Sequence, residues 1–525
     1  MSRPADPASP TEKTLRTPNP STTGTGAESD ASSSPGQRTH GSIHGAFLWS
    51  AVERFGQQFV QFGFSIVLAR LLSPVEYGLM GMLTIFFAVA MGFSDVGFGM
   101  GLIQRKEITK DDETSVFFFN IIAGIVLTLL LCAISPLAAM FYRQPILKVL
   151  LCVSSLQFVF IPFGIVQNAL MMRDMDFKTR ALLGNTATFL SGAVGIGMAW
   201  KGCGVWSLVG QVLSRYLLLN SLIWAVRPWR PTGRFRWACI QSLWPFSSRL
   251  MATYLLNTIF DNAYSVIIGR LYQPADLGQF TRASGLAQLP GGTATDVITN
   301  VTLPAFSRMQ NDTTRLKMNF RKTVRTLGAF HFPLMIGLAA VAGPLVRCLL
   351  TEKWMPCVPY LQILCFAGIL FPLQAMHRNV LTALGRSDLV FRSEMIKKVI
   401  AVITVAATIW FGITALVWGI LALSVLSYAV TGHYTLKLLG YGWTEQGRDT
   451  LPILALSLGM GLAVWAVGAV GAAGLGNGWL ILTLKIVVGV VLYGVFALAG
   501  HRSIYADAFT TGGHLFRRIF PLAVS

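Results

Sequence analysis

Four arginines stand inside long apolar stretches of this 525-residue chain. Counted along its own stretch, Arg215 falls near mid-depth, Arg54 and Arg249 fall toward one end, and Arg282 falls toward the opposite end. An arginine stays charged when it is desolvated, and it binds a phosphate through two parallel hydrogen bonds. The four arginines therefore predict a cationic path for an anionic cargo. The alternative is that each one reaches water along its own stem or pairs with a buried acid.

Polar side chains recur at every fourth position in two stretches that lie two hundred residues apart. Each set follows one helical face: Glu53, Gln57, Gln61 and Ser65 in the first, and Thr253, Asn257, Asp261 and Ser265 in the second. Such groups are costly against lipid. We expect Gln57, Gln61 and Asn257 to line a water-filled cavity. The alternative is a hydrogen-bonded seam that only packs the helices together.

Four acids accompany these helices: Glu53, Asp95, Asp261 and Asp296. Asp95-Val96 and Asp296-Val297 are offset by about the same interval of two hundred residues. The acids have two interpretations, a proton or sodium site that couples transport or salt bridges to arginines of the first helices, and we favour the salt bridges.

The composition is that of a polytopic membrane protein. The chain is 53% apolar and 12% charged, with a mean hydropathy of +0.58, whereas soluble domains carry roughly 25% charged residues. Fourteen apolar runs come close to the length that crosses a bilayer: 44–70, 75–101, 114–141, 146–172, 180–200, 204–226, 241–270, 275–303, 325–350, 357–384, 392–411, 414–437, 451–472 and 479–500.

The net charge of +19 comes from Lys and Arg that gather mainly in every second loop, which favours a topological role over nucleic-acid binding. This alternation predicts fourteen spans with both termini in the cytoplasm. The fold class is therefore all-α.

The phrase R-L-x-x-P-x-[ED]-x-G occurs at 70–78 and again at 270–278. Six spans separate the copies, so both have the same orientation in the membrane. This predicts two six-helix lobes related by an axis along the membrane normal, as in transporters with parallel repeats. Locally the phrase is a helix start, with Pro at the first turn and an acid that caps it, and it needs no binding role.

The repeat defines the expected domains: a disordered cytoplasmic tail at 1–42, a lobe at 43–226, a cytoplasmic linker at 227–240, a lobe at 241–437, two extra helices at 438–500, and a cytoplasmic tail at 501–525. The first tail is rich in Pro, Ser, Thr and Gly and has no apolar run, so it is not a signal peptide.

Motifs for catalysis and cofactors are missing from the sequence. There is no Walker A pattern, no G-x-S-x-G and no H-E-x-x-H. The seven cysteines form no C-x-x-C pair, so we expect no disulfide framework, no metal site and no cofactor. An enzyme is not expected.

Five segments together resemble the oligosaccharide flippases of the polysaccharide transporter family: LARLLSPVEYG at 68–78, SDVGFGMGLIQ at 94–104, LPAFSRMQND at 303–312, EKWMPCVPYLQIL at 352–364 and LTALGRSDL at 381–389. The resemblance covers about 44–440 and is to the subgroup of exopolysaccharide and colanic-acid-like pathways. That family shares a superfamily with multidrug extrusion antiporters and lipid II flippases.

The resemblance implies a bacterial inner-membrane protein that moves an undecaprenyl-pyrophosphate-linked oligosaccharide from the cytoplasmic to the periplasmic leaflet by alternating access. Membrane lipids are implied as partners, together with a polysaccharide polymerase and chain-length or export proteins, and nucleic acid is not. Arg54, Arg215 and Arg249 would meet the pyrophosphate, with Arg282 completing the cationic path. A cation-coupled multidrug exporter and a peptidoglycan-precursor flippase are the rival functions.

Overall fold

The computed structural model describes residues 42–94, 98–105, 107–474 and 478–500. The chain divides into two units, Met1–Ile43 and His44–Ser525, and the helices belong to the second apart from the first two residues of α1. The two predicted tails lie outside the described residues except for Ser42, and so does Asp95.

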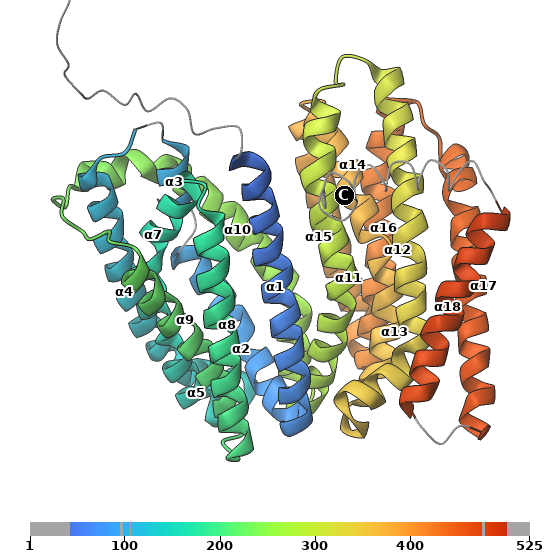
Figure 1. The fold of residues 1–525 in the computed structure, drawn as a ribbon, viewed down its shortest axis with the longest axis horizontal. Coiled ribbons are helices and arrows are strands. Elements are labelled where there is room, and N and C mark those ends of the chain that lie inside the picture. Colours follow the sequence, from blue (N-terminus) through green and yellow to red (C-terminus); the bar gives the residue numbers. More distant parts are fainter. Residues whose placement is uncertain (1–41, 95–97, 106, 475–477, 501–525) are drawn as a thin grey trace, which may run out of the picture. The chain divides into compact units, whose positions relative to one another are not determined.

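The regular elements of the described residues are helices (Figure 1), as predicted. In chain order they are α1 (Ser42–Leu71), α2 (Pro74–Ser94), α3 (Phe98–Gln104), α4 (Lys110–Tyr142), α5 (Ile146–Ser155), α6 (Gln157–Phe160), α7 (Pro162–Arg173), α8 (Phe177–Trp200), α9 (Trp206–Val226), α10 (Trp237–Leu271), α11 (Pro274–Ser307), α12 (Thr313–Leu350), η1 (Glu352–Trp354), α13 (Cys357–Gly368), α14 (Phe371–Ala383), α15 (Ser387–Thr408), η2 (Ile409–Phe411), α16 (Ile413–Leu439), α17 (Trp443–Gly474) and α18 (Gly478–Gly500).

These helices match the fourteen predicted spans in order when α2 is counted with α3, α5 with α6 and α7, and α13 with α14. Within the described residues, nine spans are long and apolar enough to cross a membrane, or ten if the pair bent by 41° at Ile161 is one span. The helices α1, α10, α11 and α15 are not among them, and the first three carry most of the polar residues singled out above.

Side-chain caps fix where several helices begin. The Thr109 hydroxyl accepts a hydrogen bond from the Asp112 amide at 3.2 Å, the Asp176 carboxylate accepts from Thr179 at 3.1 Å, and Asp312 accepts from Arg315 at 2.9 Å. Each cap satisfies an amide that the first helical turn leaves without a partner. All three starts follow loops that the sequence places on the cytoplasmic side.

The segment predicted as a linker, 227–240, is bound to the start of α4. The amides of Gly233 and Arg236 donate to the hydroxyls of Thr114 and Ser115 at 3.0 and 2.8 Å. The following helix, α10, packs against α2 and α4 of the first half as well as against α11. The first helix of the second half is therefore attached to the first half along its length.

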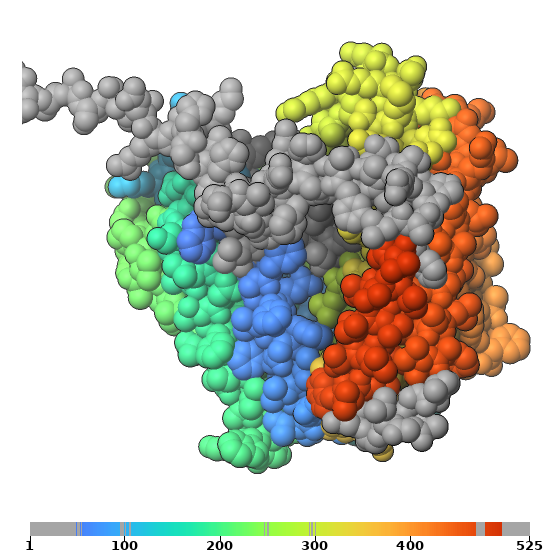
Figure 2. Space-filling view, turned by 45° about the vertical axis from the view of Figure 1, so that its right-hand side comes forward, coloured from blue at the N-terminus to red at the C-terminus, as the bar shows by residue number. Residues whose placement is uncertain are grey.

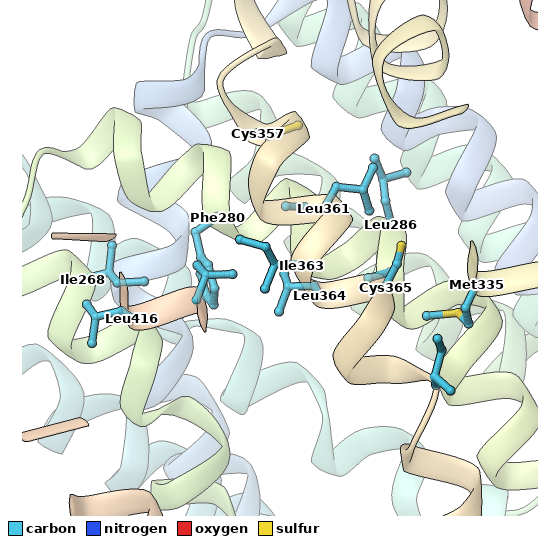
Figure 3. Packing of buried hydrophobic residues seen from close by; sticks show 14 of the residues in the cluster. Ile268, Phe280, Leu286, Met335, Cys357, Leu361, Ile363, Leu364, Cys365 and Leu416 are labelled. Atoms are coloured by element: carbon cyan, nitrogen blue, oxygen red, sulfur yellow. The ribbon is translucent and has the colours of Figure 1, made fainter. Parts of the chain in front are cut away.

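The largest buried apolar cluster has most of its members in the second half of the chain, and Figure 3 shows some of them. It includes Phe280 and Leu286 of α11, Met335 of α12, Leu361 of α13 and Leu416 of α16. In a bilayer such packing is stabilised by van der Waals contact and not by the removal of apolar surface from water. Close fit among α11, α12, α13 and α16 therefore stabilises this half.

One disulfide departs from the expectation that the chain has no disulfide framework. Cys132 of α4 and Cys152 of α5 form a disulfide, with their Cα atoms 4.5 Å apart. The two helices form an antiparallel hairpin whose turn follows Tyr142. Because both cysteines lie ten positions from Tyr142, the hairpin brings them together, which a search for C-x-x-C spacing does not detect.

Candidate functional site

The two copies of the repeated phrase meet each other. The helices that they start, α2 and α11, pack together at what we call the outer end, following the distribution of the basic loops. A Cβ atom placed on Gly78 would lie 1.7 Å from the carbonyl oxygen of Pro274, and one placed on Gly278 would lie 1.9 Å from that of Pro74. Only glycine permits such an approach. The phrase therefore has a long-range role in addition to the predicted local one.

The local role of the phrase is confirmed by its acids. The Glu76 carboxylate accepts a hydrogen bond from the Ser73 amide, and Asp276 accepts one from the Gln273 amide at 3.2 Å. These bonds fix the first turns of α2 and α11. The caps thus hold the two glycines at the positions where the helices touch.

The end of α1 is joined to the end of α12 at the same level. Arg70 Nε donates to the Leu349 carbonyl at 2.8 Å, and Lys353 Nζ donates to the Arg70 carbonyl at 2.7 Å. Trp354 Nε1 donates to the Ala69 carbonyl at 2.9 Å. We call these contacts, with the two glycines and Arg282, the outer seam. It connects the two repeats at one end of the membrane.

Arg282 lies inside the outer seam. Its guanidinium is 3.8 Å from the centre of the Tyr77 ring and 5.7 Å from that of Trp354, and Nη2 donates to the Ser65 carbonyl at 3.4 Å. Nε has no partner among the described residues, and no carboxylate there forms an ion pair with this arginine. Its charge is stabilised by aromatic faces.

Of the other three predicted arginines, one has a described side chain. Arg215 is half-buried near the middle of α9 and forms no ion pair with a described residue. The side chains of Arg54, Arg249 and Asp296 lie outside the described residues. The structure thus places Arg282 in the seam and Arg215 at mid-helix, and the ladder as a whole stays a prediction.

The polar stripe of α1 turns toward α8. Glu53 forms an ion pair with Arg180 at 3.0 Å. A Cβ on Gly184 would lie 2.3 Å from Gln57 Nε2, so the amide packs directly on α8. Gln61 is exposed. Glu53 is therefore in a salt bridge, and Gln57 contributes to a packed seam, the alternative set beside the cavity.

The corresponding part of the second half is open instead of packed. A cavity of about 660 Å³ lies between α10, α14, α15 and α16, lined by Asn257, Asp261, Glu394, Lys397 and Lys398 among others. Asp261 lies ten residues from the outer end of α10, and Lys398 ten residues from the end of α15, which is about 15 Å of helix in each case. Charged groups thus gather near mid-membrane.

Two lysines and two acids line this cavity, and one lysine and one acid form an ion pair. Lys398 Nζ donates to Asn257 Oδ1 at 3.2 Å and lies 5.0 Å from the centre of the Phe260 ring. Lys397 Nζ is 2.5 Å from Glu394 Oε1. The Asp261 carboxylate lines the same cavity without an ion pair shorter than 4 Å to a described residue. Asp261 is thus a carboxylate without a close basic partner in the described part of the cavity, a group that can chemically accept a proton or bind a cation.

Three charged residues of this cavity were not among the predicted site residues: Glu394, Lys397 and Lys398. Their signal was present, because an acid and two lysines at positions i, i+3 and i+4 interrupt the apolar run 392–411. Three charges on one face of a membrane helix should mark a functional site.

Comparison with known proteins agrees with this architecture. A family model described as polysaccharide biosynthesis protein matches residues 67–359, more than half of the chain, including both copies of the phrase. The chain belongs to this family. It is 28% identical over 63% of its length to the lipopolysaccharide biosynthesis protein WzxC of Escherichia coli, covering 68% of that protein. It is 27% identical over 77% of its length to the succinoglycan biosynthesis transport protein ExoT of Rhizobium meliloti, covering 80%.

Solved structures share the fold of this family member. The lipid II flippase MurJ in an inward closed conformation aligns with a TM-score of 0.70 over 88% of this chain and 99% of MurJ, at 15% identity. An inward-facing multidrug resistance MATE transporter of the MOP superfamily aligns with a TM-score of 0.57 over 74% of this chain and 98% of its own length, also at 15% identity. The predicted fold class is confirmed.

Proposed function

We propose that this protein is a flippase that moves undecaprenyl-pyrophosphate-linked oligosaccharide repeat units from the cytoplasmic to the periplasmic leaflet of the bacterial inner membrane. The observation that carries the proposal is membership of the polysaccharide biosynthesis family, with relatives named for the biosynthesis or transport of exported polysaccharides. No chemical step is assigned to the chain, and both termini are assigned to the cytoplasm.

The mechanism is alternating access, with the outer seam as the closure on the periplasmic side. The Gly78–Pro274 and Gly278–Pro74 contacts must separate before a sugar head can leave in that direction. Opening the seam also removes Trp354 from Ala69 and exposes Arg282, whose charge has no acidic partner in the described residues. The pyrophosphate can then bind the Arg282 guanidinium as it leaves, while the polyprenyl chain stays in lipid.

Arg215, Arg54 and Arg249 are assigned to the earlier part of the same path. Arg215 supports this role because it is half-buried at mid-helix without an ion pair to a described residue. A pyrophosphate can pair with it through charge-assisted hydrogen bonds. The sugar head needs neutral polar contacts as well, for which Gln61 and Asn257 are the candidates.

The driving force is assigned to the cavity of the second half. Asp261 and Glu394 lie there beside two lysines, so a change of protonation or of bound cation alters the pairing between α10 and α15. Consumption of the cargo by a polymerase and by chain-length or export proteins would also draw the reaction forward.

The test is a deletion strain analysed by mass spectrometry of lipid extracts, with each lipid-linked sugar assigned to its leaflet. The flippase predicts that a complete repeat unit on undecaprenyl pyrophosphate accumulates on the cytoplasmic leaflet. Unchanged lipid-linked sugars together with new sensitivity to organic cations would instead identify a multidrug exporter, and arrest of peptidoglycan synthesis would identify a precursor flippase.

A further inference from the structure

Two prolines inside α12 leave two of its carbonyls without a helical partner. Proline has no amide hydrogen, so Pro333 and Pro344 cannot bond to the carbonyls of Ala329 and Ala340, each four residues earlier. In a bilayer no water is available to replace the missing donor, and an unpaired carbonyl is costly there. Each of the two oxygens therefore needs a donor from elsewhere in the protein.

Both donors come from one helix, α18. Tyr493 Oη donates to the Ala329 carbonyl at 2.6 Å, and Lys485 Nζ donates to the Ala340 carbonyl at 3.2 Å. The acceptors are eleven residues apart on α12 and the donors eight residues apart on α18, about 16 and about 12 Å of helix axis. The long stem of Lys485 spans the difference. Two proline-freed carbonyls thus match two donors on one neighbouring helix.

The surroundings of Lys485 are built for this bond. The residue is 5% exposed, and no carboxylate among the described residues pairs with it. Gly468 of α17 makes room for its stem, because a Cβ at that position would lie 2.0 Å from Lys485 Cε. A buried lysine without an acid is expensive in the membrane, so its one bond to a free carbonyl accounts for its presence.

Apolar packing between the two helices is incomplete where these bonds form. A cavity of about 540 Å³ lies between α12, α17 and α18, lined in part by Gly337 and Gly489. Figure 2 shows α18, in red, on the surface of the bundle beside α17, in orange. A surface helix with a cavity beneath it gains less from van der Waals contact, which leaves more of its attachment to the two hydrogen bonds.

We propose that Lys485 and Tyr493 recognise the two proline-freed carbonyls of α12, and that α17 and α18 act as a splint that keeps the proline-containing part of α12 helical during transport. This assigns a task to the two helices that lie outside the repeat. The part that concerns transport rests on the proposed function, whereas the part that concerns the hydrogen bonds does not.

Further side-chain hydrogen bonds join α12 and α14 to neighbouring helices. His331 Nε2 lies 3.1 Å from the Gly368 carbonyl, which precedes Pro372 by four residues. On α14, Asn379 Nδ2 donates to Thr302 Oγ1 of α11 at 2.7 Å. Hydrogen bonds therefore link α18 to α12 and α12 to the end of α13, and the next helix, α14, is bonded to α11, a helix of the outer seam.

A double-mutant cycle on the purified protein in detergent tests the hydrogen-bond part. Lys485→Met removes the buried charge as well as the donor, so the hydrogen bond is measured by the difference between two backgrounds: the midpoint of thermal unfolding should fall by about 2 °C more with Pro344 than with Pro344→Ala. In the Pro344→Ala background, the new amide at position 344 can bond to the Ala340 carbonyl, so Lys485→Met should then cost much less. The pair Pro333→Ala and Tyr493→Phe gives a second, independent cycle.

The control is Thr483→Ala, which removes a hydroxyl of α18 that bonds to Trp479 within the same helix and should leave the midpoint unchanged. The proposal is overturned if Lys485→Met has the same effect with and without Pro344, or no effect. The transport part is measured as polysaccharide export at equal membrane levels. A fall with Lys485→Met supports the splint, and normal export despite a lower midpoint removes it. A wrong cargo assignment would leave the thermal cycle intact.

Discussion

Replacing Gly78 by alanine should open the outer seam. The added methyl would lie 1.7 Å from the Pro274 carbonyl oxygen, whereas carbon and oxygen in close contact stay about 3.3 Å apart. The two helix starts must therefore separate by about 1.6 Å, the difference between these distances. Inserting a methyl group into such a tight contact costs about 1–3 kcal/mol. The gain in helix propensity does not offset this, because α2 is helical in both conformations.

The consequence is a shift in the conformational equilibrium. A cost of about 2 kcal/mol paid only in the outer-closed state raises the outer-open fraction about 30-fold as long as that state is minor. Cys357 is a native reporter, because it is fully buried and lies close enough to Arg282 to interact with it electrostatically. In a variant without Cys203 and Cys348, its labelling by an impermeant maleimide from the periplasm should rise by the same factor.

The matched control lies on α11. Gly285→Ala adds the same methyl where no atom lies within 4 Å, so labelling and export should equal those of the parent. Export by Gly78→Ala should fall, because the transporter no longer closes toward the periplasm. Unchanged Cys357 labelling and normal export in a well-expressed Gly78→Ala variant would refute the role given to the outer seam.

Three further substitutions test other parts of the path. Arg215→Ala should abolish export at a normal membrane level, and Arg215→Lys should retain part of it. The control is Arg378→Ala, which removes an exposed arginine. Equal export by Arg215→Ala and this control would show that Arg215 is not part of the path. Lys398→Met should lower export at least tenfold. If Lys398 and Asp261 only balance each other's charge, the double variant Lys398→Met with Asp261→Asn should regain export. A double variant that stays inactive would assign ion coupling to Asp261. Trp354→Phe keeps a ring beside Arg282 but loses the hydrogen bond to the Ala69 carbonyl, which contributes about 1 kcal/mol. The rate of Cys357 labelling should therefore rise about fivefold. An unchanged labelling rate would show that this bond does not stabilise the outer seam.

The helices and their order could be predicted from the sequence because apolar length and loop charge act locally. The start of α2 at Pro74 and that of α11 at Pro274 follow from proline and a capping acid. The contact between the two starts could not be predicted in this way. It depends on how α2 and α11 meet in space, and glycine at position 78 has many possible local reasons.

The polar stripes likewise depend on contacts in space that their own spacing does not predict. Helical spacing placed Gln57 and Asn257 on equivalent faces, yet the first packs on Gly184 and the second accepts a bond from Lys398 in a cavity. The difference lies in the helix opposite, where one half has a glycine and the other a lysine. A stripe alone does not specify its partner, whereas the partner decides between a seam and a cavity.

Transport by the purified protein in proteoliposomes is the decisive measurement of flippase activity. The cargo is a prenyl-pyrophosphate-linked oligosaccharide with a fluorophore on its sugar, and an impermeant reductant reports which leaflet holds it. The wild-type protein should make the sugars of both leaflets accessible to the reductant, while Arg215→Ala should leave the inner-leaflet pool protected. Equal protection with and without wild-type protein, combined with uptake of an organic cation, would show that the protein is not this flippase.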